Sequence, residues 1–289
     1  MSKKLIINAD DFGLHRDVNL GIIEAYRHGM VCSTSLMVNG PAVDHAVHLA
    51  AENPGLEIGL HLNLSAYQCV AQPSKLNSLV DPTGNFVLQK YHAYEALLHL
   101  QKMICSQPKV LKQIAFEFSA QVEKFLDLGL KIGHVNVHQY LSLIHPKITE
   151  IYCDLIRQLE VPGRGLCFPM LDFLPLSSEE HAEIFRQLGS PGLHTTDHSI
   201  SNLADAQDQK PLFADYSAQI LKKLGQLAGS PTVRVVELIT HPGIISETVL
   251  NLDNYAWARE LEWRLVTDLE IKKTLKTMGY ASGGYQNAY

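Results

Sequence analysis

The chain has 289 residues, of which 46% are hydrophobic and 19% are charged, and its formal net charge is -6. This length and composition allow a sizeable buried core, which excludes an intrinsically disordered chain and fits one large α/β domain or two smaller domains. Acidic residues outnumber basic residues by 30 to 24 and no basic run occurs, so no nucleic-acid partner is expected.

Neither the start of the chain nor any later stretch predicts a secreted or membrane protein. Only three apolar residues, Leu5 to Ile7, follow the basic pair at the start, far fewer than the roughly 7 to 15 of a signal peptide. No apolar stretch approaches the roughly 18 residues of a membrane span. The five cysteines form no CxxC pair, which disfavours a disulfide framework. We expect a cytoplasmic protein without a membrane partner, and a homodimer is the commonest assembly for such proteins.

Short apolar runs alternate with segments of helical period along the whole chain. The predicted strands cover residues 4–11, 33–39, 57–64, 132–139, 165–169, 192–198 and 233–243. The predicted helices cover residues 18–29, 42–52, 109–129, 146–159, 178–188, 213–228 and 255–278. Repeated alternation of strand and helix predicts a parallel sheet with helical crossovers, either in a (β/α) barrel or in an open doubly wound sheet.

Polar residues at the carboxyl ends of the predicted strands favour the barrel. Asp10 and Asp11 end the first strand, and His61, His138 and His241 end later strands. In a (β/α) barrel these ends meet at one mouth, whereas an open sheet would spread them apart. No repeat or linker divides the chain. We therefore predict a single α/β domain over residues 1–289, a distorted TIM-like barrel with about seven parallel strands.

The longest departure from the alternation is an insertion at residues 65–108. Its first part contains the turn signals Asp81-Pro82 and Thr83-Gly84-Asn85, and a helix is predicted from about residue 90 to 105. Because this insertion directly follows a strand that carries a candidate site residue, it is a natural place for a substrate-binding loop.

Histidines near two strand ends predict a metal site. His61 lies on the third predicted strand, and His134 and His138 share one face of the fourth. Each buried imidazole needs hydrogen-bond partners, so packing alone is a poor explanation for histidines near the ends of two predicted strands. One carboxylate and two histidines are a common ligand set for a divalent ion. We therefore expect one aspartate of the pair Asp10-Asp11 to bind metal and the other to lie nearby as a base.

The same residues leave alternatives open. Asp10 and Asp11 would also serve as the N-cap and first-turn acid of the following helix. Two imidazoles and a carboxylate suit zinc, iron, cobalt or nickel, and magnesium fits if water supplies the remaining ligands. Magnesium and zinc are the favoured ions for this single divalent site.

Three further residues at strand ends are candidates for supporting the site. His241 precedes the rigid turn Pro242-Gly243, and its near-neutral unperturbed pKa suits a general acid or base, although an imidazole can also cap a turn. Arg164 and Asp197 would either orient the site through an ion pair or form structural salt bridges.

Five motifs in chain order carry a family resemblance. They are "INADDFG", "GLHLNL", "HVNVHQ", "TTDH" and "ELITHPG", between residues 7 and 243. Together they resemble the signature blocks of YdjC-like carbohydrate deacetylases, the group that includes chitooligosaccharide deacetylase. The resemblance implies a distorted (β/α) barrel that removes the N-acetyl group from an amino sugar or a short N-acetylglucosamine oligosaccharide. It also implies that Asp11, His61 and His138 bind the metal, that Asp10 is the base and that His241 is the acid.

One block departs from the family pattern. Members typically read HxDSHQHxH where this chain reads HVNVHQYLS, so Asn136 replaces an aspartate and Tyr140 and Ser142 replace two histidines. His138 is retained. The departure leaves two alternatives: a metal-dependent hydrolase of another acylamide or ester, and a metal-binding or sugar-binding protein without catalysis. A phosphate ester would require basic residues at the mouth, where the sequence offers only Arg164.

Overall fold

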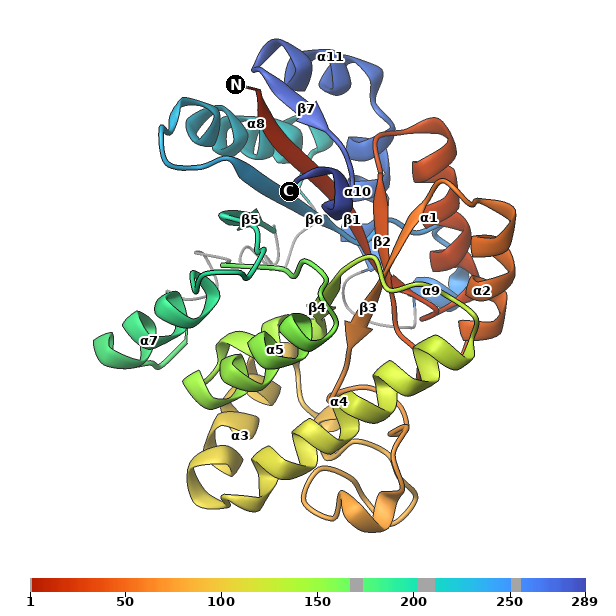
Figure 1. Cartoon of the computed structure of the whole chain (residues 1–289). Coiled ribbons are helices and arrows are strands. Elements are labelled where there is room, and N and C mark those ends of the chain that lie inside the picture. Colours follow the sequence, from red (N-terminus) through yellow and green to blue (C-terminus); the bar gives the residue numbers. More distant parts are fainter. Residues whose placement is uncertain (1, 167–173, 202–210, 251–255) are drawn as a thin grey trace.

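A curled sheet of parallel strands forms the centre of the molecule (Figure 1). The computed structural model describes residues 2–166, 174–201, 211–250 and 256–289. Its strands are β1 (Lys3–Phe12), β2 (Ser33–Leu36), β3 (Glu57–Leu62), β4 (Val135–Val137), β5 (His198–Ile200), β6 (Val235–Thr240) and β7 (Tyr280–Ser282). Neighbouring strands are arranged in the order β4-β3-β2-β1-β6-β5, and β7 pairs with the start of β1. All these pairs are parallel, as the sequence predicted.

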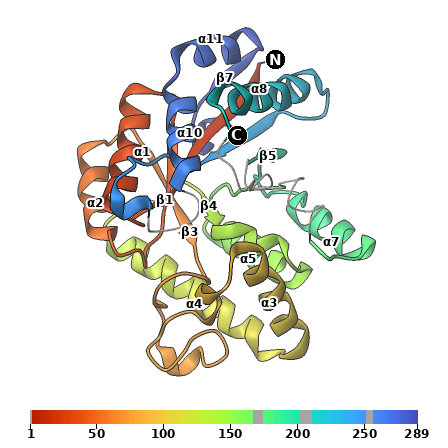
Figure 2. The ribbon, with the colours of Figure 1, turned by 180° about the vertical axis from the view of Figure 1, so that it is seen from behind.

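Helices surround the outside of this sheet (Figures 1 and 2). They are α1 (Arg16–His28), α2 (Val43–Glu52), α3 (Ala93–Ser106), α4 (Lys109–Asp127), α5 (Pro146–Gln158), α7 (Ser178–Leu188), α8 (Phe213–Gly229), α9 (Glu247–Leu250), α10 (Ala256–Thr267) and α11 (Leu269–Thr277). Short 3-10 helices are η1 (Pro73–Lys75), η2 (Val87–Lys90), η3 (His138–Leu143) and η5 (Tyr285–Asn287). Helix α1 packs against β1, α2 and α10. No helix within the described ranges has the length and apolar character needed to cross a membrane.

The two faces of the central strand β1 have different partners, because side chains alternate along a strand. Leu5 and Ile7 join the main apolar core, whereas Ile6 packs separately with Val235 and Tyr285. Further along the Ile6 face, Asn8 and Asp10 are buried as well. The inner side of the curled sheet therefore changes from apolar to polar towards the carboxyl ends of the strands.

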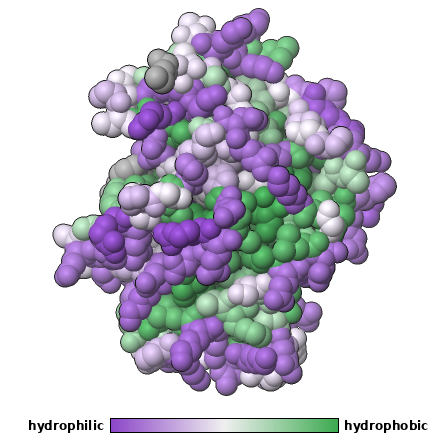
Figure 3. All heavy atoms as spheres, in the orientation of Figure 1, coloured by the Kyte–Doolittle hydropathy of each residue, from purple (hydrophilic) through white to green (hydrophobic). Residues whose placement is uncertain are grey.

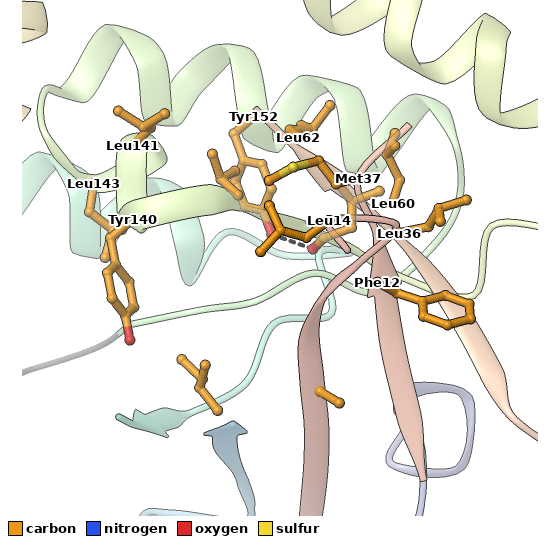
Figure 4. Packing of buried hydrophobic residues seen from close by; sticks show 14 of the residues in the cluster. Phe12, Leu14, Leu36, Met37, Leu60, Leu62, Tyr140, Leu141, Leu143 and Tyr152 are labelled. Atoms are coloured by element: carbon orange, nitrogen blue, oxygen red, sulfur yellow. Dashed lines mark hydrogen bonds between the residues drawn. The ribbon is translucent and has the colours of Figure 1, made fainter. Parts of the chain in front are cut away.

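The main core lies between the sheet and the helices, and Figure 4 shows part of it. Leu36, Leu60 and Leu62 are fully buried there, and burial of each such side chain contributes roughly 1.5 to 3 kcal/mol. Tyr152 of α5 lies among them and donates its hydroxyl to the carbonyl oxygen of Val135 at 2.7 Å. This bond ties α5 to β4, the strand that precedes His138.

The sheet forms a half-barrel, and the predicted distorted TIM-like barrel is not confirmed as a full barrel. Strands β4 and β5 lie at the two edges of the strand order, and between them Gly163 makes isolated parallel bridges to Val135 and Thr195. The sequence predicted a strand at residues 165–169. Residues 165 and 166 lie outside any strand, and residues 167–169 lie outside the described part of the chain.

Two other sequence predictions differ from the structure. The helix predicted over residues 255–278 is divided into α10 and α11, because Asp268 between them caps α11 by accepting hydrogen bonds from the amides of Glu270 and Ile271. The strand predicted over residues 192–198 is displaced to His198–Ile200. Strand β7 was not predicted.

The insertion after β3 has the irregular structure that its turn signals predicted. Asp81 accepts hydrogen bonds from the amides of Thr83 and Asn85 at 2.8 and 3.1 Å. Buried Glu117 of α4 accepts from the amides of Val70 and Ala71, both at 2.9 Å. The predicted helix in the second half of the insertion is α3. The insertion is therefore fastened to α4 at the side of the sheet.

Candidate metal site

A bulge in β1 brings two adjacent aspartates into the site. Consecutive residues of a regular strand point to opposite faces, but three steps from Ala9 to Phe12 match only two steps from Thr34 to Leu36 on β2. Asp11 absorbs the extra residue with a φ of 70°, a left-handed conformation that aspartate tolerates better than most residues. The next helix is capped by His15, so the alternative that the aspartates cap it is wrong.

Asp11, His61 and His138 converge at the carboxyl ends of β1, β3 and β4. Asp11 Oδ1 lies 3.6 Å from His61 Nε2 and 3.3 Å from His138 Nδ1. The two imidazole nitrogens lie 3.2 Å apart. Asp11 and His61 are buried, and the side chain of His138 is 18% exposed. The three potential ligand atoms thus form a compact triangle with access to solvent on the side of His138.

These residues fit a divalent ion by geometry and by donor chemistry. Asp11 Oδ1 is buried without a hydrogen-bond partner, which is costly unless another group binds its charge. Ligand atoms about 2.1 Å from one ion are separated by roughly 3.0 to 3.4 Å. The observed separations of 3.2, 3.3 and 3.6 Å are close to this range. Two imidazoles and one carboxylate would hold the ion, and the sequence prediction of this ligand set remains a prediction.

Asp10 lies on the polar inner face and accepts many hydrogen bonds. Arg164 donates to its two carboxylate oxygens at 2.8 Å each. Asn8, Ser35 and Asn136 donate to Oδ1 at 2.7, 2.8 and 3.0 Å. Burial raises the pKa of Asp10, but Arg164 and the nearby His61 and His241 outweigh it, so the pKa lies below its ordinary value. Asp10 is therefore an ionised carboxylate in a fixed orientation.

Arg164 links Asp10 to a second buried acid, Glu237 of β6. Its Nε lies 3.0 Å from both Glu237 oxygens and its Nη2 lies 2.7 Å from Oε1. Ser199 of β5 also donates to Glu237, at 3.1 Å. One guanidinium between two carboxylates keeps all three charged groups paired in the interior, as buried charges require. The prediction that Arg164 orients the site through an ion pair is consistent with this geometry.

His241, at the end of β6, lies between Asp10 and the helix α10. Its Nε2 is 3.9 Å from Asp10 Oδ2, and its Nδ1 is 3.3 Å from Glu262 Oε2. The same Glu262 oxygen accepts from the backbone amide of His241 at 2.6 Å. Burial lowers the pKa of His241, but the charges of Glu262, Asp11 and Asp10 outweigh burial and raise it. The imidazole is therefore biased towards its protonated form.

Arg259, three residues before Glu262 on α10, binds the other oxygen of the candidate ligand Asp11. Its Nη2 lies 2.9 Å from Asp11 Oδ2, and the whole side chain is buried. Burial raises the pKa of Asp11, whereas Arg259 first, and then His138 and His61, hold it well below its ordinary value. Asp11 therefore directs one oxygen to a fixed cation and the other to the two imidazoles.

The sequence predicted that five residues would lie together but did not single out two neighbours of theirs from α10. Asp10, Asp11, His61, His138 and His241 lie together as expected. Arg259 and Glu262 were missed, although two charged residues on a helix buried against the core are a usable signal.

Asp197 and His134, which the sequence pattern also singled out, lie away from the candidate metal ligands. Asp197 accepts hydrogen bonds from the amides of Arg234 and Val235 at the start of β6. His134 lies at the opposite end of the sheet, where its Nδ1 is 3.1 Å from Glu57 and its ring stacks on Tyr285.

A separate hollow of about 580 Å³ lies at the amino-terminal ends of the strands, away from Asp11, His61 and His138. Ile132, Pro162 and His194 line it just before the segments that enter the sheet. Leu126 and Leu130, from the end of α4 and the segment after it, add apolar surface. Figure 3 shows apolar side chains gathered on this face. None of the candidate ligands borders this hollow.

The fold and the site define an α/β protein in which Asp11, His61 and His138, three residues that could hold a divalent ion, lie beside Asp10 and His241 at the carboxyl ends of parallel strands. The profile of the family described as YdjC-like protein matches residues 4–277, and the chain belongs to this family. It is 33% identical over 270 residues to a carbohydrate deacetylase of Brevibacillus brevis, covering 93% of each chain. It is 33% identical over 279 residues to a carbohydrate deacetylase of Listeria monocytogenes, covering 94% of each.

A solved structure shares the same fold over the whole chain. The crystal structure of an Enterococcus faecalis protein, described as a proposed cellobiose-phosphate cleavage protein, superposes with a TM-score of 0.77. It is 26% identical and the match covers 99% of both chains. The family resemblance seen in the five motifs is therefore confirmed across the chain.

Proposed function

We propose that this protein is a metal-dependent hydrolase that removes the N-acetyl group from an amino sugar or a short N-acetylglucosamine oligosaccharide. The observation that carries the proposal is the triangle of Asp11, His61 and His138 beside Asp10 and His241. The relatives named carbohydrate deacetylases, which match over nearly the whole chain, support the choice of substrate class. Magnesium or zinc is the expected ion, and cobalt, nickel or iron would suit the same ligands.

The residues around the triangle divide the chemistry of amide hydrolysis between them. A bound divalent ion would act as a Lewis acid that polarises the acetyl carbonyl and activates a water molecule. Asp10, which Arg164 holds ionised, accepts a proton from the attacking water. Protonated His241 donates a proton to the nitrogen as the carbon-nitrogen bond breaks, because an amine anion is a very poor leaving group. The products are acetate and the free amino sugar.

We make further proposals for the closure of the barrel, the role of the insertion, the location of the protein and its oligomeric state. We infer that the half-barrel closes through the bridges at Gly163 into a distorted TIM-like barrel. The insertion at residues 65–108 shapes the substrate site next to β3. The protein acts in the cytoplasm on a small carbohydrate, with neither nucleic acid nor membrane as a partner, and a homodimer is its expected assembly.

The alternative of a phosphate ester as substrate has little support at this site. It depended on Arg164 as a basic residue at the mouth. All three guanidinium nitrogens of Arg164 donate to the carboxylates of Asp10 and Glu237. Arg259 is also buried and binds Asp11. Neither arginine therefore offers a free guanidinium face to a phosphate group.

Acetate release from N-acetylglucosamine dimers and longer oligomers tests the proposal directly. The protein is stripped with a chelator and then supplied with zinc, magnesium, cobalt, nickel or iron(II) in turn, iron under anaerobic conditions. We expect release that depends on the ion and is lost in His138→Ala, while the surface variant His48→Ala keeps full activity. Metal binding without release from any acetylated sugar would favour another hydrolase or a non-catalytic protein.

The role of Asp10 needs its own variant. Asp10→Asn keeps most of the side-chain shape, so metal content should stay near normal while the rate falls roughly 100-fold or more. Full activity in Asp10→Asn would exclude Asp10 as the base. Loss of metal from this variant would instead indicate that Asp10 belongs to the ligand set.

A further inference from the structure

Asn136 lies between the metal triangle and the proposed base. Its side chain, on the inner face of β4, is fully buried. The oxygen Oδ1 lies 2.6 Å from His61 Nδ1, and the amide nitrogen Nδ2 lies 3.0 Å from Asp10 Oδ1 and 3.1 Å from Ser35 Oγ. This residue replaces the aspartate that is typical at this position of the motif. It touches one candidate metal ligand and the proposed base, but it is neither.

The charges around Asn136 determine which way its amide group points. Arg164 binds both oxygens of Asp10, so Asp10 is ionised and can only accept hydrogen bonds. The atom of Asn136 that faces Asp10 must therefore be the NH2 group, and the atom that faces His61 must be the oxygen. An amide oxygen only accepts, so His61 Nδ1 must carry the hydrogen of that bond.

We propose that Asn136 is a positioning residue that holds His61 in the tautomer with a free Nε2 lone pair, while its NH2 group fixes Asp10. A neutral imidazole carries one proton, so a proton on Nδ1 leaves Nε2 free to bind an ion. Nε2 is the atom that faces Asp11 and His138. The role of Asn136 towards Asp10 and turnover rests on the proposed function. Its role in the His61 tautomer and metal binding does not, because binding of a metal requires no reaction.

Only an amide satisfies both neighbours at once. An aspartate at position 136 would still accept from His61, but it would place a second carboxylate beside Asp10, where like charges repel. A leucine would leave His61 Nδ1 without its 2.6 Å partner and Asp10 without one of its donors. Asn136→Asp therefore removes only the donor to Asp10, whereas Asn136→Leu removes both that donor and the acceptor for His61.

The experiment measures the His61 tautomer, the metal affinity and the turnover of each variant. Nitrogen NMR of histidine-labelled, metal-free protein should find the His61 proton on Nδ1, and calorimetry gives the affinity for zinc and magnesium. Asn136→Leu should bind metal about 10- to 100-fold more weakly. Asn136→Asp should recover affinity close to that of the natural chain, yet lower kcat by about tenfold or more, since it lacks the donor to Asp10.

Asn63→Leu provides the matched control. Asn63, which directly follows β3, is also fully buried and donates to the carbonyl of Ala66, so its loss tests the general effect of removing a buried amide. We expect it to lower thermal stability and leave metal affinity unchanged.

The two halves of the proposal fail separately. A His61 proton on Nε2 in the natural chain would overturn the tautomer role, and this measurement does not require any variant to fold. Metal affinity in Asn136→Leu equal to that of the natural chain would overturn it as well. Natural kcat in Asn136→Asp would overturn the role towards Asp10. If no acetylated sugar is hydrolysed, the proposed function fails while the tautomer and affinity results still decide the metal half.

Discussion

At the scale of single residues, the charges around His241, the proposed acid, determine the pH range in which it holds a proton. Glu262, Asp11 and Asp10 raise its pKa against the opposing effect of burial, and Arg259 lies 3.4 Å from its carbonyl oxygen. A proton donor works below its pKa and is lost as the pH rises through it. A raised pKa therefore extends the active range towards alkaline pH.

Glu262→Gln should shift this alkaline limit. The variant keeps an oxygen that can accept from the backbone amide of His241, now 2.6 Å from Glu262, but it removes the negative charge. We expect the pKa of His241 to fall and the alkaline limb of kcat/KM to move to lower pH. The control Glu270→Gln changes a surface residue of α11 and should leave the profile in place. An unmoved limb in Glu262→Gln would show that His241 is not the group that limits activity.

At the scale of elements, α10 supports both halves of the site from outside the sheet. Arg259 and Glu262 are three residues apart and therefore lie on the same face of the helix. One binds Asp11 and the other binds His241. Gly243 lets the chain after His241 pass close to α10, since a side chain there would approach Arg259 at 3.3 Å. The position of this one helix thus fixes a proposed metal ligand relative to the proposed acid.

Arg259→Met should lower the free energy of unfolding, and added metal should restore part of the loss. Without the guanidinium, the buried carboxylate of Asp11 has no cation, which costs about 3 to 5 kcal/mol in the metal-free protein. A bound ion would supply the missing positive charge, so zinc or magnesium should recover part of the loss. Chemical denaturation with and without metal measures both values. The control Arg264→Met removes an exposed arginine that lies over Phe213 and should cost less, independently of metal.

Equal losses for Arg259→Met in the presence and absence of metal would contradict this interpretation. They would indicate that Arg259 contributes by packing against Gly243 and its neighbours, not by balancing the charge of Asp11.

At the scale of the whole molecule, the sequence predicted the features that strand order determines and missed those that tertiary packing determines. The carboxyl ends of strands in a curled, barrel-like parallel sheet converge, so the Asp10-Asp11 pair, His61 and His138 could be placed together from local patterns. The bulge at Asp11 leaves no local signal, because its backbone conformation is imposed by pairing with β2. Arg259 reaches the site only because α10 packs beside α1 and β6, a long-range contact that no periodicity reports.

The end of the chain covers the sheet at the side opposite the site. Tyr285 of η5 is fully buried, stacks on His134 with ring centres 4.0 Å apart and packs with Ile6 and Val235. Glu57 at the start of β3 accepts from the amide of Tyr285 at 3.2 Å. In TIM barrels, active sites lie at the carboxyl ends of the strands and the amino-terminal face contributes stability, and the candidate site and the packing of Tyr285 are arranged in the same way in this half-barrel.

Tyr285→Ala should therefore destabilise the protein without weakening the metal site. Loss of a fully buried aromatic side chain costs about 3 to 5 kcal/mol, because the cavity it leaves is only partly filled. The variant Tyr289→Ala, which truncates a half-exposed tyrosine beside His194, should cost clearly less. Denaturation curves give the stabilities, and calorimetry of folded protein gives the metal affinities. An affinity that fell about tenfold in Tyr285→Ala, equivalent to roughly 1.4 kcal/mol, would mean that the two ends of the half-barrel are energetically coupled through the polar interior between Glu237 and Asp10.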